Sequence, residues 1–293
     1  MPELPEVQTT VNDLNKVIKG LKITDVWTDW NKIFRGPKGL KAAQRILKGR
    51  RILGVRRRAK YILIDLSDNK TLVIHQKISG HLLYGKWKKE NNLWKTDKGP
   101  LKDDPQNRFI RLIFFLSNGK MLALSDLRRF GKALVLDTDK MDEYKEIKEL
   151  GPEPLEKSFT FSKFKEIFTK KKGKIKQLLM NQNIIAGIGN IYSDEILWYA
   201  GVHPLKRAET LKERELKKIY KAMRKVLSLA IKARGDSFQD YRTILGEKGE
   251  YQYRQKAYQM TGKKCFKNDG GIIKRIKLGG RSAHFCPRHQ TQY

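Results

Sequence analysis

The spacing of apolar residues divides the chain into segments that predict different secondary structures. Near the N-terminus, apolar residues repeat at the interval of one helix face, at Val7, Val11, Leu14, Ile18 and Leu21. Gly20 is suited to end such a helix. From about residue 22 to residue 135 the pattern becomes strand-like. The first part of the chain therefore predicts one helix followed by several strands.

Two pairs of apolar runs in this region predict β-hairpins. Residues 61–66 and 71–75 flank a polar Ser-Asp-Asn-Lys turn. Residues 110–116 and 121–124 flank an Asn-Gly pair, a dipeptide typical of tight hairpin turns. Several antiparallel strands after one helix predict a β-sandwich or a barrel. The polar, lysine-rich stretch 86–107 predicts an exposed loop.

A change of pattern near residue 150 predicts a second domain. Two prolines within residues 150–154 indicate a linker, and beyond it the apolar positions follow helical spacing, as at Leu216, Ile219, Met223, Leu227 and Ala230. Residues after Gly235 return to short, glycine-punctuated segments. We predict an α+β, multidomain chain with an N-terminal domain at 1–135, a linker at 136–154, a helical domain at 155–235 and a C-terminal minidomain at 236–293.

Composition narrows the class of partner. The chain has 293 residues, 63 Lys and Arg against 31 Asp and Glu, and a formal net charge of +32. Such a charge predicts a polyanionic partner, with nucleic acid ahead of an anionic membrane surface. No apolar run reaches the ~20 residues of a membrane-spanning helix, and no signal-peptide pattern is visible. Two cysteines do not make a disulfide scaffold, and we expect a cytoplasmic protein without membrane contact.

The N-terminal residues form a candidate reaction centre. Removal of Met1, which a small second residue permits, would leave Pro2 with a secondary amine. An α-amino group has a pKa near ~8, so part of it is a neutral nucleophile at physiological pH. The carboxylates of Glu3 and Glu6 could move protons for this amine. The alternative is an ordinary tail that happens to contain proline and glutamate.

Two further segments of the N-terminal half have candidate nucleic-acid contacts. The basic run 56–60 precedes an apolar strand and is either a solvated face or a phosphate contact with Lys60 directed at chemistry. In residues 126–131, Arg128 could read base edges while Phe130 wedges between base steps. This hexapeptide is equally compatible with an ordinary loop.

In the second half of the chain, residues 183–192 stand between two helical stretches. Two glycines permit a tight turn, and Asn190 is a good helix N-cap. Backbone amides at that helix start, together with the Asn190 side chain, could hold a phosphate. The alternative is a plain helix–helix turn.

The C-terminal segment contains a candidate zinc site. Cys286 and His289 have the C-x2-H spacing of half a zinc site. Cys265 supplies a third ligand, and Asp269 is the nearest further ligand type, because carboxylates also bind zinc. A hairpin held by packing without metal is the alternative. His284 is a spare imidazole that we expect to be structural.

Taken together, these features resemble the family of bacterial formamidopyrimidine-DNA glycosylase, a family of oxidised-base repair enzymes that is shared with endonuclease VIII. The resemblance rests on five segments in the right order: PELPEV at 2–7, the lysine at 60, DLRRFG at 126–131, IIAGIGNIYSDEIL at 184–197 and GGRSAHFCPRHQ at 279–290. A PELPE start favours the formamidopyrimidine branch.

The resemblance implies roles for five catalytic residues. Pro2 would attack the anomeric carbon of the damaged nucleotide, expel the base and leave a Schiff base to the deoxyribose. Glu3 and Glu6 would be the carboxylates of this pocket. Lys60 would contact a flanking phosphate and donate a proton, while Arg281 would grip phosphate and assist the second elimination. The implied activity is that of a bifunctional DNA glycosylase and AP lyase, which ends in β,δ-elimination.

The resemblance also implies the DNA contacts and the architecture. Arg128 and Phe130 would fill the duplex when the damaged nucleotide is flipped out, with Ile78 beside them. Lys172 and Asn190 would contact phosphates. The implied fold is an N-terminal helix plus β-sandwich, a helix-two-turn-helix domain and a C-terminal zinc-finger-like β-hairpin. The implied partner is double-stranded DNA with oxidised bases or abasic sites, bound by a monomer, and the loop reading the flipped base would lie within 235–249.

Three features depart from the family pattern. Ile78 stands where a methionine is usual, and Asn181 stands where an acidic residue is common. The family's finger follows C-x2-C-x16-C-x2-C, whereas here Asp269 and His289 replace two of the cysteines. The sixteen-residue span between Asp269 and Cys286 is kept. We therefore expect the hairpin to fold and to hold one structural zinc through Cys265, Asp269, Cys286 and His289.

The sequence favours excision of oxidised purines as the function. An endonuclease VIII-like activity on oxidised pyrimidines is the alternative within the same class. A DNA-binding protein without catalysis is the alternative from another class, and it is favoured by the net charge and the altered finger.

Overall fold

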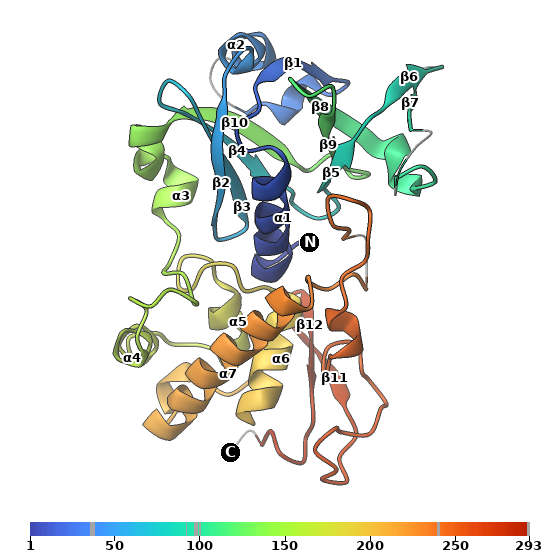
Figure 1. Cartoon of the computed structure of the whole chain (residues 1–293). Coiled ribbons are helices and arrows are strands. Elements are labelled where there is room, and N and C mark those ends of the chain that lie inside the picture. Colours follow the sequence, from blue (N-terminus) through green and yellow to red (C-terminus); the bar gives the residue numbers. More distant parts are fainter. Residues whose placement is uncertain (36–38, 92, 97–98, 100, 239–240, 292–293) are drawn as a thin grey trace. The chain divides into compact units, whose positions relative to one another are not determined.

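The computed structural model describes residues 1–35, 39–91, 93–96, 99, 101–238 and 241–291. By its internal contacts the chain divides into two compact units (Figure 1). The first unit consists of residues 1–148 and 233–250, and the second of residues 149–232 and 251–293. The segment 236–250, which the sequence groups with the C-terminal minidomain, thus belongs to the first unit.

The first helix, α1 (Leu4–Val17), begins three residues before the predicted start at Val7. Glu3 is its N-cap and forms a capping box with Glu6, and a proline lies in the first turn, where its missing N–H costs nothing. Its apolar face is fully buried in the core of the first unit. The helix is tied to the neighbouring strand where the Val55 N–H donates to Asn15 Oδ1 at 2.8 Å. The N-terminus is therefore held in place by packing.

A β-sandwich forms the rest of the first unit, as predicted. One sheet has the order β1 (Ile23–Thr28), β8 (Ile110–Leu116), β9 (Met121–Ser125) and β5 (His81–Gly85). The other has the order β10 (Lys132–Asp137), β4 (Lys70–His75), β3 (Tyr61–Leu66) and β2 (Ile52–Arg58). The pairs β3–β4 and β8–β9 confirm both predicted hairpins. Residues alternating along the strands supply one shared hydrophobic core.

The stretch 86–107 is not simply an exposed loop, so that prediction was wrong for its described residues. It contains β6 (Lys88–Glu90), β7 (Leu93–Lys95) and a 3-10 turn, η2 (Pro105–Phe109). Trp87, Trp94 and Leu101 are buried in a second small core on the outer side of the sheet that contains β5, β8 and β9. The lysine-rich composition concealed these apolar anchors, which have no regular period.

Shorter elements complete the first unit. They are η1 (Asn31–Ile33), α2 (Gly39–Leu47), η3 (Thr138–Glu143) and α3 (Lys145–Lys148). The predicted linker 136–154 thus contains the end of β10, η3 and α3.

The second unit contains the predicted helices and the C-terminal hairpin. Its helices are α4 (Phe161–Thr169), α5 (Ile175–Met180), α6 (Asn190–Ala200) and α7 (Glu213–Lys232), with short turns η4 (Ala208–Thr210) and η5 (Tyr251–Tyr253). The strands β11 (Lys274–Leu278) and β12 (Arg281–Phe285) pair antiparallel. Within the described parts of the chain, no helix combines the length and apolar character needed to cross a bilayer.

Candidate active site and nucleic-acid contacts

The N-terminal turn is buried and is organised by one carboxylate. Pro2, Glu3 and Glu6 are all buried. Glu6 Oε2 accepts the Glu3 N–H at 2.7 Å, and Glu6 Oε1 accepts the Asp236 N–H at 2.8 Å. The Tyr241 hydroxyl donates to the Glu6 carbonyl at 3.3 Å. Glu6 therefore joins the start of the chain to a segment more than two hundred residues later.

Asp236 is a third carboxylate at this turn, which the sequence did not indicate. Burial, together with the neighbouring Glu3 carboxylate, raises its pKa to about 6, although the Phe238 N–H and the N-terminal amine act to lower it. Gly235 has φ +84°, a left-handed conformation, and a Cβ at this position would lie 2.9 Å from Glu6 Oε1. A carboxyl group with a raised pKa beside an amine can both accept and return a proton.

Lys60 lies in the tight turn between β2 and β3, after Ala59 in a left-handed conformation (φ 51°). It is buried, which excludes a solvated face for this residue of the basic run. Burial lowers the pKa of nearby His75, and Lys77, Lys132 and Lys60 lower it further in that order. Of these three lysines, Lys132 is paired with the Glu146 carboxylate.

Two loops of the first unit carry the predicted duplex-filling residues. Ile78 and Phe130 are exposed, at 39% and 43%, and the Arg128 guanidinium lies 5.0 Å from the centre of the Phe130 ring. Asp126 is buried beneath them and braces both loops. Its carboxylate accepts from Ser79 Oγ at 2.6 Å and from the Gly131 N–H at 2.7 Å. Exposed apolar tips on a braced base are suited to insertion between bases.

The phosphate-binding residues predicted in the second unit lie at two helix starts. Lys172 is exposed shortly before α5. Asn190 is the first residue of α6, and Gly189 is its N-cap, so the predicted capping role of Asn190 was wrong. A glycine can take the cap because Gln182 holds the turn, accepting from the Gly187 N–H at 2.9 Å and donating to the Ile188 carbonyl at 2.7 Å.

The four predicted metal ligands come together. One donor atom from each of Cys265, Asp269, Cys286 and His289 lies within 4.8 Å of every other. His289 Nδ1 is 2.7 Å from Asp269 Oδ2 and 3.6 Å from Cys265 Sγ. Cys286 Sγ is 3.5 Å from Asp269 Oδ2. Two sulfurs, one nitrogen and one carboxylate oxygen form a donor set that fits tetrahedral zinc.

The outer atoms of this cluster have partners that orient the ligands. Asp269 Oδ1 accepts the Gly271 N–H at 2.9 Å, and His289 Nε2 lies 3.3 Å from the Trp198 carbonyl oxygen. An Nε2–H directed at a carbonyl leaves Nδ1 unprotonated and available to a metal. Gly271 is required here because a Cβ would lie 2.3 Å from Cys286 Sγ.

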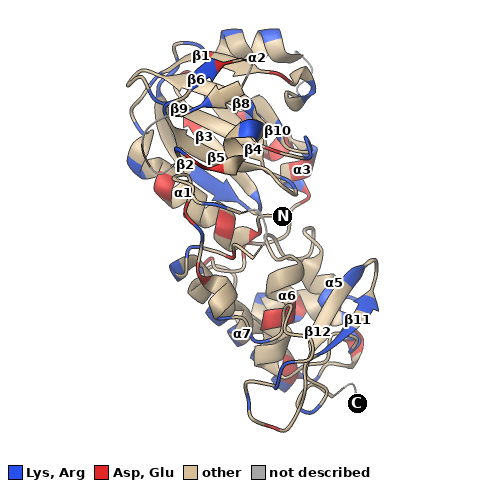
Figure 2. Cartoon of the chain, turned by 90° about the vertical axis from the view of Figure 1, so that its right-hand side faces the viewer, with Lys and Arg blue, Asp and Glu red and all other residues tan. Residues whose placement is uncertain are grey.

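The hairpin β11–β12 presents basic side chains, and Figure 2 shows Lys and Arg along β11 as well as along β2. Arg281 begins β12, is exposed, and shares a cavity of about 170 Å³ with residues of α5. His284 contacts Asp194 at 2.8 Å, in agreement with the structural role expected for it.

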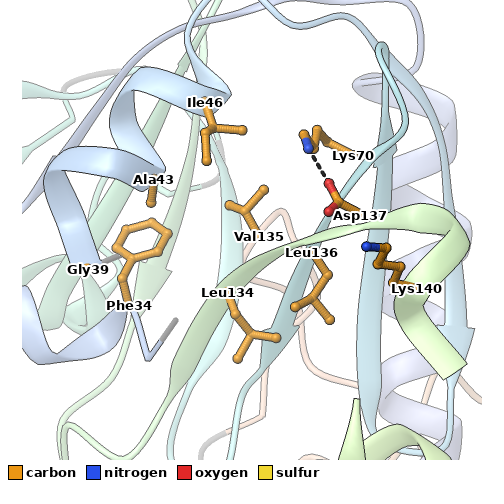
Figure 3. A pocket seen from close by; sticks show the side chains of 10 residues that line it. All are labelled: Phe34, Gly39, Ala43, Ile46, Lys70, Leu134, Val135, Leu136, Asp137 and Lys140. Carbon is orange, nitrogen blue, oxygen red and sulfur yellow. Dashed lines mark hydrogen bonds and ion pairs between the residues drawn. The ribbon is translucent and has the colours of Figure 1, made fainter. Parts of the chain in front are cut away.

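A separate cavity of about 280 Å³ lies in the first unit (Figure 3). Apolar side chains such as Phe34 and Leu134 line it, and the Lys70–Asp137 ion pair closes one side. None of its lining residues is a predicted site residue, so it adds nothing to the candidate active site.

Comparisons with known proteins agree along the whole chain. The profile of the formamidopyrimidine-DNA glycosylase N-terminal domain matches residues 1–133, and that of the formamidopyrimidine-DNA glycosylase H2TH domain matches residues 150–242. The formamidopyrimidine-DNA glycosylase of Pelotomaculum thermopropionicum is 39% identical over 290 residues, covering 99% of both chains. That of Streptococcus pneumoniae R6 is 36% identical over 292 residues and covers 100% of both.

Solved structures are similar over the same length. Lactococcus lactis Fpg in complex with DNA containing an abasic site superposes with a TM-score of 0.86 at 32% identity, covering 99% of each chain. A variant of that protein in complex with DNA containing Fapy-dG gives a TM-score of 0.87 at 32% identity, covering 99% of this chain and 100% of the other.

Proposed function

This chain belongs to the formamidopyrimidine-DNA glycosylase family and is a DNA glycosylase of base excision repair, and we propose that it excises oxidised purines through the amine of Pro2. The observation that carries the proposal is the buried N-terminal turn. Glu6 holds the Glu3 and Asp236 amides at 2.7 and 2.8 Å, so Pro2 is fixed beside several carboxylates. A flexible tail would be neither buried nor held beside carboxylates.

In the proposed reaction the Pro2 nitrogen attacks C1′ of the damaged nucleotide. The C1′–N bond breaks, and the base leaves with the bonding electrons and takes up a proton. The Pro2 nitrogen loses its proton, the C1′–O4′ bond then breaks with its electrons going to O4′, which takes up a proton, and the sugar ring opens. The resulting iminium is cationic because Pro2 is a secondary amine, and it acts as an electron sink. Loss of a C2′ proton to a carboxylate, with Glu3 as our assignment, then expels the 3′-phosphate. A second elimination expels the 5′-phosphate, which Arg281 assists as a cation.

The remaining predicted residues hold the duplex in this proposal. Extruding a nucleotide costs a few kcal/mol, and Arg128, Phe130 and Ile78 offset that cost by filling the space it leaves. Lys60, Lys172 and Asn190 contact phosphates. Support comes from the exposure of the loop tips and from the solved relatives, which are described in complex with lesion-bearing or abasic DNA. We propose that the protein acts as a monomer.

We also propose one structural zinc per chain, held by Cys265 Sγ, Asp269 Oδ2, Cys286 Sγ and His289 Nδ1. The support is the mutual proximity of the four donor atoms and the hydrogen bonds that orient two of them. Zinc would fix the loop before β11 to the segment after β12. Metal analysis of purified protein tests this: a stoichiometry near one is expected, and a value near zero would leave the hairpin held by packing.

Borohydride trapping tests the reaction. Duplex DNA with oxoguanine opposite cytosine should give a covalent adduct with the untagged protein. A tag that blocks the N-terminal amine should abolish the adduct while DNA binding persists, and the same tag at the C-terminus serves as control. Full glycosylase activity of the protein with a blocked amine would refute the assignment of Pro2. DNA binding without any adduct, even by the untagged protein, would favour a non-catalytic DNA-binding protein.

Oxidised pyrimidines are a second candidate substrate class. One solved relative, Lactococcus lactis Fpg, is described in complex with DNA containing an oxidised pyrimidine, at a TM-score of 0.85 and 32% identity. A panel of lesion duplexes separates the two classes, and we expect faster release of oxidised purines.

A further inference from the structure

A buried charged group in the second unit has no part in the proposed reaction. Lys176 of α5 and Asp194 of α6 form an ion pair at 2.6 Å, with side chains 1% and 0% exposed. Lys176 Nζ also donates to the Ser282 carbonyl at 2.6 Å. Asp194 Oδ2 accepts the His284 N–H at 3.0 Å and lies 2.8 Å from His284 Nδ1. Two helices therefore hold the backbone of β12 at two adjacent points.

Stability alone does not account for this group. Removing two charges from water carries a large desolvation penalty, and apolar side chains of similar volume often stabilise a fold equally well or better. Apolar packing, unlike hydrogen bonds, does not fix the position of a strand along its own axis. Hydrogen bonds to the Ser282 carbonyl and the His284 N–H fix the position of β12 along its own axis. A slip of one residue would turn its side chains to the opposite face.

The turn of the same hairpin is also seated on α5. Gly279 has φ +57°, and a Cβ on it would lie 2.5 Å from Gln177 Nε2. Lys176, Gln177 and Arg281 line one cavity of about 170 Å³. Arg281 thus stands between a closely packed turn and the Ser282 carbonyl that Lys176 holds.

We propose that Lys176, Asp194 and His284 are positioning residues for Arg281. The group sets where the guanidinium stands, and through it the efficiency of the second elimination. This inference rests on the proposed function, because it takes from it the role of Arg281. Displacing a cation that stabilises a leaving phosphate slows that step, whereas attack by Pro2 does not need Arg281.

The test compares two products of one reaction. With an abasic-site duplex, Asp194→Asn should lower the ratio of δ- to β-elimination product about tenfold, while the rate of borohydride trapping stays within about twofold. Glu213→Gln is the matched control, because it removes one partner of an exposed ion pair with Lys165 in the same unit. It should change neither quantity.

A second variant guards against loss of folding. Removing one member of a buried pair leaves the other charge unpaired and strongly destabilises the fold, so the double variant Lys176→Met/Asp194→Leu replaces both charges. It should keep a cooperative thermal transition and show the same shift in product ratio.

The decisive measurement is a double-mutant cycle with Arg281→Ala. If the group acts through Arg281, Asp194→Asn should have no further effect on the product ratio in that background. An equal effect in both backgrounds, or an equal loss of trapping and δ-elimination, would overturn the inference. An absence of trapping by the unaltered protein would instead overturn the role of Pro2, so the two failures are distinguishable.

Discussion

At the scale of single residues, Glu6 contributes most to the candidate site. Its two carboxylate oxygens accept amides from Glu3 and Asp236, residues at opposite ends of the first unit's sequence. The sequence predicted Glu3 and Glu6 because their carboxylates are close in sequence to the Pro2 amine. It could not predict Asp236, because an acidic residue after a glycine is ordinary, and its proximity to the N-terminal turn arises from tertiary folding.

Gly235→Ala should disturb this arrangement. The glycine has φ +84°, and a Cβ would lie 2.9 Å from Glu6 Cγ and Oε1. Gly20→Ala is a matched control, since Gly20 has φ +86° with nothing within 4 Å of the added Cβ. Both variants should lose about 1–2 kcal/mol in denaturant unfolding from backbone strain. Slower borohydride trapping is expected for Gly235→Ala alone, and equal trapping by both would contradict the role of Glu6.

The buried Glu195 predicts a pH dependence of stability. Burial raises the pKa of its carboxyl to about 7, although N–H groups of residues 256–258 lower it. Between the ordinary value of 4.5 and about 7, the folded state binds a proton that the unfolded state has released. This contribution is therefore fully present below pH 4.5 and is lost as the pH rises through 7.

Denaturant unfolding of the protein and of Glu195→Gln at several pH values measures this contribution. Relative to the variant, the unaltered protein should lose up to about 3 kcal/mol between pH 4.5 and pH 8. A difference between the two proteins that stays constant with pH would show that Glu195 does not titrate in this range.

At the scale of elements, the loops at 76–80 and 126–131 act as one braced pair. The sequence predicted the second loop from its arginines and phenylalanine, and Ile78 from the family pattern. The brace was not predictable, because the Ser79–Asp126 hydrogen bond joins loops from different hairpins. In contrast, both hairpins themselves were predicted correctly, since two apolar runs with turn residues between them are a local signal.

Ser79→Ala tests the brace. Ser79 Oγ donates to Asp126 at 2.6 Å and accepts the Arg128 N–H at 3.1 Å, so its loss should loosen both loop tips. We expect affinity for a lesion duplex to fall about three- to tenfold, the effect of about one hydrogen bond. Ser67→Ala is the control, because its hydroxyl accepts the Arg51 N–H in a turn of the same sandwich. An equal loss for both variants would argue against a specific brace.

At the scale of the whole molecule, charge and chain path were predictable to different degrees. The net charge of +32 predicted a polyanionic partner directly. The path was not predictable, because residues 233–250 return to the first unit after a complete helical segment. That return depends on long-range contacts such as the Arg234–Asp13 ion pair at 2.8 Å, which no local pattern encodes.

The affinity for undamaged duplex should depend steeply on salt. Each phosphate neutralised by a lysine or arginine releases counterions, so the logarithm of the association constant should fall linearly with the logarithm of salt concentration. Lys172→Gln should reduce the slope by about one unit if this exposed residue contacts a phosphate. Fluorescence anisotropy across a salt series measures both, and an unchanged slope would remove Lys172 from the interface.

The discontinuous first unit has a consequence for the timing of synthesis. Residues 1–148 leave the ribosome well before residues 233–250, with the 84 residues of 149–232 between them. At roughly 5–20 residues per second, the interval lasts about 4–17 seconds. During that interval the Glu6 carboxylate lacks the Asp236 amide, and Tyr241 has not yet reached the turn. We therefore expect an aminopeptidase to have access to Met1 before Asp236 and Tyr241 form their hydrogen bonds with Glu6.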